Sequence, residues 1–489
     1  MTGFGEFNKS KNKKNKTFKE QIINQAIKFH SEGNISEAAK YYQYCINQRF
    51  NDCRVFSNYG LILQNRGNLK EAELSYRKAI QLNPNFSNAY LNLGNILKKT
   101  GKLQEAEFSY RKAIEINPNF VDAHFNLGNI LIDLGKLQEA ESSLLKAIEL
   151  NPDFAMAYNS ISLLKYSENN QIWQDQLFSK SILINKLPKE QVDIYFARAN
   201  ILHKKKKYKN SAKNLQLANN LKLDLHRTNA DALINKSIEL LVESDKKVSN
   251  KIERTQFPEN IFIVGMPRSG STLLESILSM RDDVYDLGEI NILEESFIEY
   301  KRSRQEINLA ELYFKKVNDK TKLNTITNKW LYNYQYAGII ASQILNSKII
   351  HCYRNPLDNI LSIYRAHFAK GNEYSSSLVD CANVYLNQEE IMSKYKNKFA
   401  SKIYNFNYES LVRNPNQEIK SLISWLGWEW NESFLTPHLN SRSVSTRSNI
   451  EVRSPINSKS IDGWKNYKDM LKPAIEILTQ TDRYRDLLS

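Results

Sequence analysis

Apolar positions follow a helical period in paired segments along the first half of the chain. In residues 88–120 and 122–154, apolar side chains recur at spacings of three, four and seven residues in two successive segments. This spacing places them on one face of an α-helix. A polar, glycine-containing turn separates the two segments of each stretch, so the pattern predicts helical hairpins.

These hairpins repeat with a period of 34 residues. Glycines stand at Gly33, Gly67, Gly101 and Gly135, and an alanine follows each of them five residues later. Small residues let helices approach closely. With a proline that closes each unit, they resemble the tetratricopeptide repeat, which stacks hairpins into an α-solenoid.

The repeat array is expected to cover residues 20–240, because a degenerate hairpin at residues 193–222 continues the pattern. The concave face of such an array is expected to bind a protein or peptide. The alternative is a scaffold or dimer surface.

Length and charge limit the class of protein. The 489 residues predict two to four domains. The formal net charge of +15 favours anionic partners. The basic runs lack interleaved aromatic residues, so we expect no nucleic-acid binding. Residues 1–19 are strongly basic and are predicted to form a disordered tail.

Membrane and cysteine patterns are also informative. No segment approaches the roughly 20 apolar residues of a membrane-spanning helix, and no apolar run follows the basic N-terminus. We therefore expect a soluble, cytoplasmic protein without a membrane span. The four cysteines show no disulfide or metal-ligand spacing, which argues against a disulfide framework or a zinc site.

The most informative segment is a β-branched run followed by a glycine-rich loop and an apolar-periodic helix. The loop, residues 265–272, has the sequence GMPRSGST. Between a strand and a helix, such a loop presents backbone N–H groups and a helix N-terminus to a phosphate-like anion. Ser271 stands where a nucleoside triphosphatase carries lysine, and Arg268 supplies a charge earlier in the loop, so triphosphate hydrolysis is disfavoured.

This segment resembles the sulfotransferases that use 3′-phosphoadenosine-5′-phosphosulfate. It resembles more closely the bacterial proteins in which tetratricopeptide repeats precede a tyrosylprotein-sulfotransferase-like domain. The resemblance covers residues 255–489 for the enzyme domain and 20–240 for the repeats. It implies a reaction without a metal ion. It also implies that the 5′-phosphosulfate is held by Arg268, Ser269, Gly270, Ser271 and Thr272.

A second phosphate-binding element follows a second strand. Residues 348–368, KIIHCYRNPLDNILSIYRAHF, contain a β-branched run, then Arg354 and, eight residues later, Ser362. An arginine at a strand end and a hydroxyl in the next helix can converge on one phosphate. The resemblance implies that this pair binds the 3′-phosphate.

Two further residues are implied as catalytic groups. Transfer of a sulfuryl group to a hydroxyl needs in-line positioning, charge neutralisation and a base that takes the acceptor proton. The resemblance implies Glu289 as this base and Lys329 as the cation that stabilises charge on the leaving phosphate oxygen. The bacterial pattern here is Asp-Lys-x-Pro. This chain departs from it, because Asn328 precedes the lysine and the proline is missing.

The C-terminal part carries the remaining residues that the resemblance implies. Tyr408 matches a tyrosine that contacts the nucleotide, and the polar segment that follows residue 440 carries Ser445, Arg453 and Lys459. The basic side chains of this segment are expected to close over the nucleotide phosphates as a lid.

Together these patterns predict an α-solenoid followed by a P-loop-like α/β domain with a mainly parallel central sheet. Its strands are expected near residues 261–265, 348–354 and 402–408. The predicted function is sulfuryl transfer to a hydroxyl of a protein tyrosine, a saccharide or a small molecule. Two alternatives stay open: a nucleotide or small-molecule kinase that uses the same loop, and a repeat scaffold with an inactive sulfotransferase-like domain.

Overall fold

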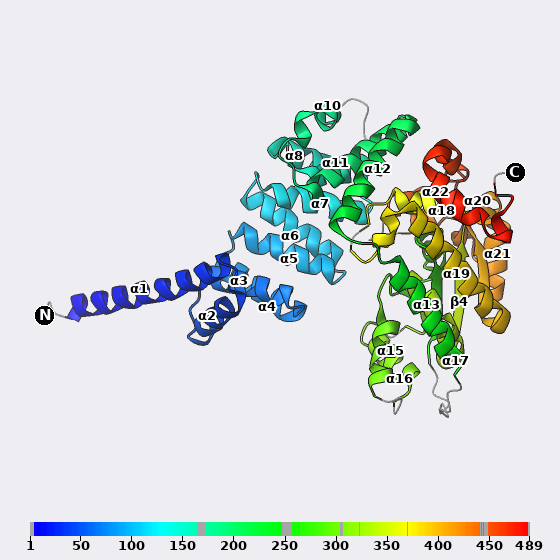
Figure 1. Ribbon diagram of the computed structural model, residues 1–489. Helices are drawn as coiled ribbons and strands as arrows, with labels where there is room; N and C mark the ends of the chain where they lie inside the picture. Colours follow the sequence, from blue (N-terminus) through cyan, green and yellow to red (C-terminus); the bar gives the residue numbers. More distant parts are fainter. Residues whose placement is uncertain are drawn as a thin grey trace. The chain divides into compact units, whose positions relative to one another are not determined.

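The computed structural model describes residues 4–164, 172–246, 257–303, 307–321, 323–368, 370–440, 442, 444 and 448–487, with side chains described from residue 18 onward. The chain divides into two compact units, Met1–Gln176 and Leu177–Ser489. In the described residues, the first unit is built of helices, and the second surrounds a sheet with helices (Figure 1).

The first unit consists of successive helices that pack as hairpins: α1 with α2, α3 with α4, α5 with α6, and α7 with α8 (Figure 1). This packing confirms the predicted helical repeats. The helices are α1 (Phe4–Ser31), α2 (Ile35–Asn47), α3 (Cys53–Asn65), α4 (Leu69–Leu82), α5 (Ser87–Lys99), α6 (Leu103–Ile116), α7 (Val121–Asp133), α8 (Leu137–Leu150), α9 (Ala155–Leu163) and α10 (Ile172–Phe178), which contains the unit boundary.

Glycines explain both the turns and the close crossings of the hairpins. Gly67 and Gly101 have φ angles of 83° and 79° at their turns, a region that favours glycine. Inside α5, a Cβ on Gly94 would lie 2.5 Å from Cε1 of Tyr110 in α6. A larger residue at this crossing would push the two helices apart.

The structure differs from the sequence-based domain limits at two places. The predicted disordered tail, residues 1–19, belongs to α1 from Phe4 onward. The compact units divide at residue 176 and not near residue 240. The reason is that the hairpin of α11 (Pro188–Lys204) and α12 (Tyr208–Leu225) shares a hydrophobic core with α18 (Pro356–Tyr364) and α22 (Lys468–Thr479) of the second unit.

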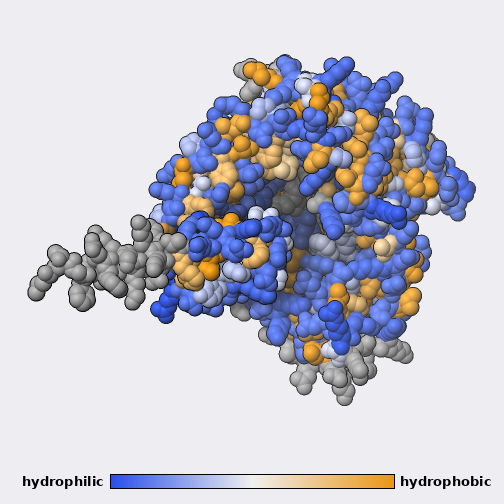
Figure 2. Space-filling model, turned by 60° about the vertical axis from the view of Figure 1, so that its left-hand side comes forward, coloured by the Kyte–Doolittle hydropathy of each residue, from blue (hydrophilic) through white to orange (hydrophobic). Residues whose placement is uncertain are grey.

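One face of the molecule is largely hydrophilic (Figure 2). On the face shown in Figure 2, apolar residues (orange) lie singly or in small groups among hydrophilic residues (blue). Among the described residues, no helix is both long and apolar enough to cross a bilayer.

The described part of the second unit contains one sheet of five parallel strands in the order β2-β3-β1-β4-β5. In the register of the central pair, Ile261 of β1 lies opposite Lys348 of β4. The strands are β1 (Glu259–Gly265), β2 (Val284–Asp286), β3 (Thr325–Asn328), β4 (Ser347–Tyr353) and β5 (Ile403–Asn407). The parallel sheet confirms the predicted fold class. The sequence predicted β1, β4 and β5 but missed the short strands β2 and β3.

Helices cover both faces of this sheet. The described helices that follow α12 are α13 (Ala230–Ser244), α14 (Ser271–Leu278), α15 (Ile292–Arg302), α16 (Leu309–Asn318), α17 (Ala337–Gln343), α18 (Pro356–Tyr364), α19 (Leu378–Lys398), α20 (Tyr408–Arg413), α21 (Pro415–Leu426) and α22 (Lys468–Thr479). Short 3₁₀ segments are η1 (Ser181–Leu183), η2 (Leu331–Tyr336), η3 (Glu373–Ser376), η4 (Ala400–Lys402), η5 (Glu432–Leu435), η6 (Pro437–Leu439), η7 (Glu451–Arg453), η8 (Gly463–Tyr467) and η9 (Asp482–Tyr484).

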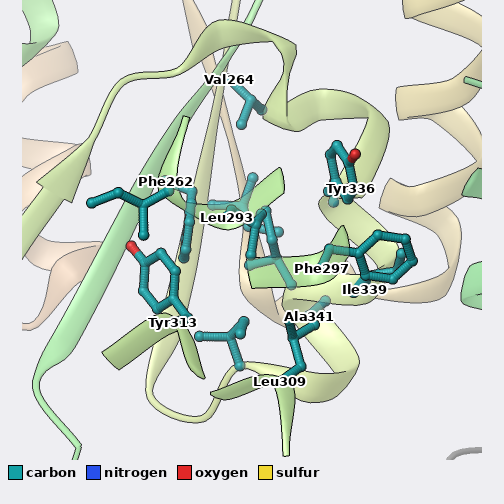
Figure 3. Close-up of a cluster of buried hydrophobic side chains, with 14 of the residues drawn as sticks. Phe262, Val264, Leu293, Phe297, Leu309, Tyr313, Tyr336, Ile339 and Ala341 are labelled. Carbon is teal, nitrogen blue, oxygen red and sulfur yellow. The ribbon is translucent and has the colours of Figure 1, made fainter. Parts of the chain in front are cut away.

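The central strand β1 is buried on both faces. Ile261 and Ile263 pack with residues of α14 and α21. Phe262 and Val264 belong to the core on the other face, together with residues of α15, α16 and α17 (Figure 3). Since helices shield both faces from water, the strand is a continuous apolar run instead of an alternating one.

Candidate active site

The carboxyl ends of the parallel strands lie at one edge of the sheet and lead into polar residues. β1 leads into the loop after Gly265, β2 ends at Asp286, β3 is followed by Lys329, and β4 is followed by Arg354. β1 is also a switch point of the topology, because β3 and β2 lie on one side of it and β4 and β5 on the other. In open parallel sheets, ligands bind in the crevice at such a point.

The loop between β1 and α14 has a tightly held backbone. Arg268 and Gly270 have φ angles of 67° and 91°. A non-glycine residue in this left-handed region costs roughly 1–2 kcal/mol. The Asn359 amide donates to the Pro267 carbonyl at 2.9 Å, and a Cβ on Gly270 would lie 2.5 Å from Cδ2 of Tyr408. Such a turn directs successive N–H groups into an anion-binding concavity in front of the helix N-terminus.

The hydroxyl groups of this loop belong to buried residues. Ser269, Ser271 and Thr272 are 1%, 4% and 6% exposed. Thr272 Oγ1 accepts a hydrogen bond from Lys329 Nζ at 3.3 Å. Among the described residues, Ser269 Oγ has no hydrogen-bond partner. A buried hydroxyl without a partner is costly, so this atom suits a site in which a ligand supplies the partner.

Arg268 joins the loop to two other segments of the second unit. Its Nε donates to Ser362 Oγ at 3.0 Å. Its terminal nitrogens donate to Ser448 and, at 2.6 Å, to Glu451. The loop and the second predicted phosphate-binding element therefore meet at this guanidinium.

Arg354 lies against the same loop. One terminal nitrogen donates to the Arg268 carbonyl at 3.3 Å, so Arg354 and Ser362 both contact Arg268. The Arg354 guanidinium lies over the ring of Tyr408, 4.7 Å from its centroid. Glu409 lies 3.8 Å from Arg354 Nε, an atom without a hydrogen-bond partner in the described part of the chain.

Lys329 and Glu289, the predicted catalytic pair, are neighbours. Lys329 Nζ lies 3.4 Å from Glu289 Oε1 and 2.8 Å from Glu275 Oε2. The lysine side chain is 1% exposed, whereas that of Glu289 is 45% exposed. The ammonium group is therefore shielded from water, and the Glu289 carboxylate is accessible to a hydroxyl that approaches from solvent.

Opposite charges hold both buried members of this group in their ionised forms. Burial by itself lowers the pKa of the Lys329 ammonium, but the charges of Glu275 and Glu289 outweigh it and hold the pKa above its usual value. Burial by itself raises the pKa of Glu275, but the charges of Lys329 and Arg442 hold it below its usual value.

Sequence reasoning missed Glu275 and Arg442. Arg442 donates to Glu275 Oε2 at 3.1 Å and pairs with Asp286. Asp286 in turn accepts the backbone N–H of Gly288 at 2.6 Å. The sequence does contain a feature that could have identified Glu275, since this residue is a lone charge in the apolar sequence STLLESIL, three residues after Thr272. Arg442 had no local signal, because its role depends on contacts with distant segments.

The residues predicted near the C-terminus fall in different places. Arg453 donates to the carbonyls of Asn440 and Arg442 at 2.7 and 2.6 Å, so it holds the backbone of its own segment. Lys459 is exposed, and no described contact joins its side chain to the loop. Ser445 lies outside the described residues.

Within the described ranges, no group of three or more His, Cys, Asp or Glu side chains is placed to hold a metal ion. The cations around the loop are instead side chains of arginine and lysine.

Comparison with known families agrees with this architecture. Residues 258–432 match the model of the sulfotransferase family. Three tetratricopeptide repeat models match residues 60–101, 87–120 and 109–142. The chain therefore combines tetratricopeptide repeats with a sulfotransferase-family domain, which confirms both resemblances found in the sequence.

Two curated relatives are similar to parts of the chain. A protein of Aquifex aeolicus (strain VF5), described as an uncharacterized protein, is 29% identical over 248 residues, which cover 45% of this chain and 32% of that protein. A Caenorhabditis briggsae protein named "Putative protein-tyrosine sulfotransferase" is 24% identical over 234 residues, which cover 43% of this chain and 82% of that protein. The match thus spans about a third of the length of the first relative.

Solved structures of repeat proteins are also similar. A crystal structure of MamA is 25% identical, with 28% of this chain and 81% of that chain covered and a TM-score of 0.27. The structure titled "Crystal structure of YrrB: a TPR protein with an unusual peptide-binding site" is 21% identical, with 38% and 90% covered and a TM-score of 0.29. These TM-scores are too low to support an argument about function.

Proposed function

We propose that the chain is a sulfotransferase that transfers the sulfuryl group of 3′-phosphoadenosine-5′-phosphosulfate to a hydroxyl acceptor. The main observation that supports this proposal is that Lys329 and Glu289 lie beside the phosphate loop. A buried ammonium contacts the loop hydroxyl of Thr272, and an exposed carboxylate lies 3.4 Å from that ammonium. The family match over residues 258–432 supports it.

The residues around the loop fit this donor. It is charged at a 5′-phosphosulfate and at a 3′-phosphate, so it needs two groups of anion-binding atoms. The loop N–H groups, Ser269, Thr272 and Lys329 would hold the first. Arg354 and Ser362 would hold the second. Two buried atoms without hydrogen-bond partners among the described residues, Ser269 Oγ and Arg354 Nε, are groups that such a ligand would satisfy.

In the transfer, the acceptor oxygen forms a bond to sulfur while the bond between sulfur and the donor's phosphate oxygen breaks. Glu289 takes the proton of the acceptor hydroxyl, since its side chain is 45% exposed and can be reached from solvent. Lys329 stabilises the negative charge that develops on the leaving phosphate oxygen. Its burial favours this role, because a charge acts more strongly where water is excluded.

For the acceptor, we propose a protein or peptide hydroxyl, with tyrosine as the first candidate. The name of the Caenorhabditis briggsae relative supports this choice. A groove of about 680 Å³ in the first unit, lined by residues of α4, α5 and α6, also supports a peptide ligand. Phe108 lines this groove and is 60% exposed, and exposed aromatic side chains are enriched at protein-binding surfaces.

The direct test incubates the full chain with labelled donor and a panel of tyrosine peptides, saccharides and small phenols. Label on an acceptor is the expected result. Calorimetry separates the alternatives: a sulfotransferase binds 3′,5′-bisphosphoadenosine without magnesium and ignores ATP, whereas a kinase binds ATP with magnesium. If the chain binds neither nucleotide, the proposal is wrong and the repeat scaffold is favoured.

The assignment of the base is tested with Glu289→Gln. Turnover should fall by about 10²–10⁴-fold, the usual contribution of a positioned base, while bisphosphoadenosine still binds. Glu295→Gln is the matched control, because Glu295 is 63% exposed in α15 and pairs with Lys316 on the surface. Unchanged turnover in folded Glu289→Gln would overturn the assignment.

A further inference from the structure

Helix α14 buries a carboxylate that the proposed reaction does not use directly. Glu275 is 2% exposed. Its Oε2 accepts hydrogen bonds from Lys329 at 2.8 Å and from Arg442 at 3.1 Å. Its Oε1 has no hydrogen-bond partner among the described residues. A buried carboxylate is costly, and replacement by an apolar residue often stabilises a fold, so packing alone does not explain this acid.

The neighbouring lysine needs a permanent counter-charge. Lys329 is 1% exposed, and burial without a partner drives a lysine toward its neutral form. Glu289 cannot provide this charge throughout the reaction. As the base, it becomes neutral in the same step in which negative charge develops on the leaving group. Glu275 can stay ionised through that step, since the charges of both Lys329 and Arg442 favour its carboxylate form.

We propose that Glu275 is a positioning residue for the transfer, which keeps Lys329 protonated and directed at the phosphate loop while Glu289 accepts the proton. This inference rests on the proposed function. Two of the partners of the ammonium, Glu275 Oε2 at 2.8 Å and Thr272 Oγ1 at 3.3 Å, stand three residues apart on α14. One face of this helix therefore presents both groups to the same lysine.

Arg442 connects Glu275 with the turn that carries the base. It also pairs with Asp286 at the end of β2, and Asp286 accepts the backbone N–H of Gly288 at 2.6 Å. Glu289 follows Gly288 directly. The same network thus holds the lysine from one side and the base from the other.

The titration of Lys329 depends on each group that faces it. These groups are Glu275 from α14, Glu289 after β2, the Cys352 thiol from β4, and Arg442 beyond Glu275. The two carboxylates raise the pKa of Lys329 against the effect of burial. Without the charge of Glu275, one carboxylate remains, at 3.4 Å, and the pKa of Lys329 must fall.

The first experiment measures this titration in the full chain without ligand. Lysine side chains are labelled with ¹³C at Cε, and the Lys329 signal is assigned by its loss in Lys329→Arg. In Glu275→Gln, the signal should titrate at least about 2 pH units lower than in the unaltered protein. Glu259→Gln, which removes the partner of Lys348 at the amino end of β1, should leave it unchanged. If Glu275→Gln does not fold, Glu275→Asp replaces it and should give a smaller shift in the same direction.

The second experiment measures bisphosphoadenosine affinity by calorimetry from about pH 6.5 to about pH 9, a range that includes the expected new pKa of Lys329. The affinity of Glu275→Gln should match the unaltered protein at the lower pH and fall by up to about tenfold per pH unit above the new pKa of Lys329. Lys329→Arg, in the same background, should abolish this pH dependence, because arginine does not titrate in this range.

The outcomes separate the two proposals. An unchanged Lys329 titration in Glu275→Gln, or an affinity that shows no new pH dependence, overturns the positioning role even if the unaltered protein binds the nucleotide. No nucleotide binding by the unaltered protein overturns the proposed function, whatever the titration shows. A loss of affinity that is equal at every pH indicates a structural role and contradicts the inference.

Discussion

Replacement of Lys329 by methionine tests whether buried charges stabilise the second unit. Lys329 is 1% exposed. Methionine keeps most of the apolar contacts of its side chain and removes the charge. Glu275 then loses the ammonium at 2.8 Å and keeps Arg442 at 3.1 Å.

These distances allow an estimate of how much unfolding free energy the variant loses. At an effective dielectric constant of about 20, two unit charges at the 2.8 Å separation attract each other by roughly 6 kcal/mol. The Arg442 pair contributes a similar amount, so the variant loses about half of the attraction on Glu275. Breaking a buried pair costs about 3–5 kcal/mol. Because Arg442 remains, we expect the lower end, a loss of about 3 kcal/mol at pH 8.

The loss should depend on pH. In the variant, the pKa of Glu275 rises, since burial is now opposed by one cation instead of two. A carboxyl group with a raised folded-state pKa binds its proton more tightly in the folded chain, so stability increases as the pH falls toward the unfolded pKa. The loss relative to the unaltered protein should therefore shrink to about 1 kcal/mol at pH 5.

Urea unfolding followed by tryptophan fluorescence measures this effect in the second unit. Five of the six tryptophans lie there: Trp330, Trp425, Trp428, Trp430 and Trp464. Lys236→Met is the matched control, because Lys236 pairs with Glu294 where its side chain is 34% exposed. Lys236→Met should lower the unfolding free energy by about 1 kcal/mol or less at both pH values. Equal losses for Lys329→Met at pH 5 and pH 8, or a loss no larger than the control's, would refute the reasoning.

Two other changes test the repeats and an acid-sensitive contact. Gly94→Ala, which would stabilise an ordinary helix by about 1 kcal/mol, should instead destabilise the first unit by about 1–3 kcal/mol, because its Cβ would lie 2.5 Å from the Tyr110 ring. Gly101→Ala meets no atom within 4 Å but has a φ of 79°, so it should cost only about 1 kcal/mol; thermal scans by circular dichroism should rank the two variants in this order. Burial, with the charges of Arg365 and Lys204, lowers the pKa of His203 to about 3, so its contribution to stability is complete above the unfolded pKa and is lost as the pH falls below it. When the pH is lowered from 7 to 5, the unfolding free energy measured in urea should therefore fall by about 2 kcal/mol less in His203→Gln than in the unaltered protein. Equal decreases in the two proteins would contradict this pKa.

The repeats and the phosphate loop were predictable because each depends on residues close together in the sequence. In the repeats, a glycine forms each turn, and neighbouring units in sequence pack as neighbours in space. In the loop, strand, turn and helix are consecutive, and Gly270 stands where the φ angle is 91°.

The short strands and the unit boundary were not predictable in this way. β2 and β3 have three and four residues, too few for a clear period. The hairpin of α11 and α12 has the pattern of a repeat, yet its apolar face packs with α18 and α22, far along the chain. Which surface an apolar helix face covers depends on the assembled core and not on the helix alone.

At the candidate site too, some charged residues could be predicted from the sequence and others are brought together only by the fold. By itself, the sequence determined the 34-residue repeat and the loop, and through a family resemblance it led to the prediction that Lys329 and Glu289 form a catalytic pair. Tertiary structure decided that Glu275 pairs with this lysine and that Arg442, 167 residues further along, pairs with Glu275. No local pattern encodes these pairings. They arise because folding removes water from several charges at once, and each buried charge must then find an opposite one.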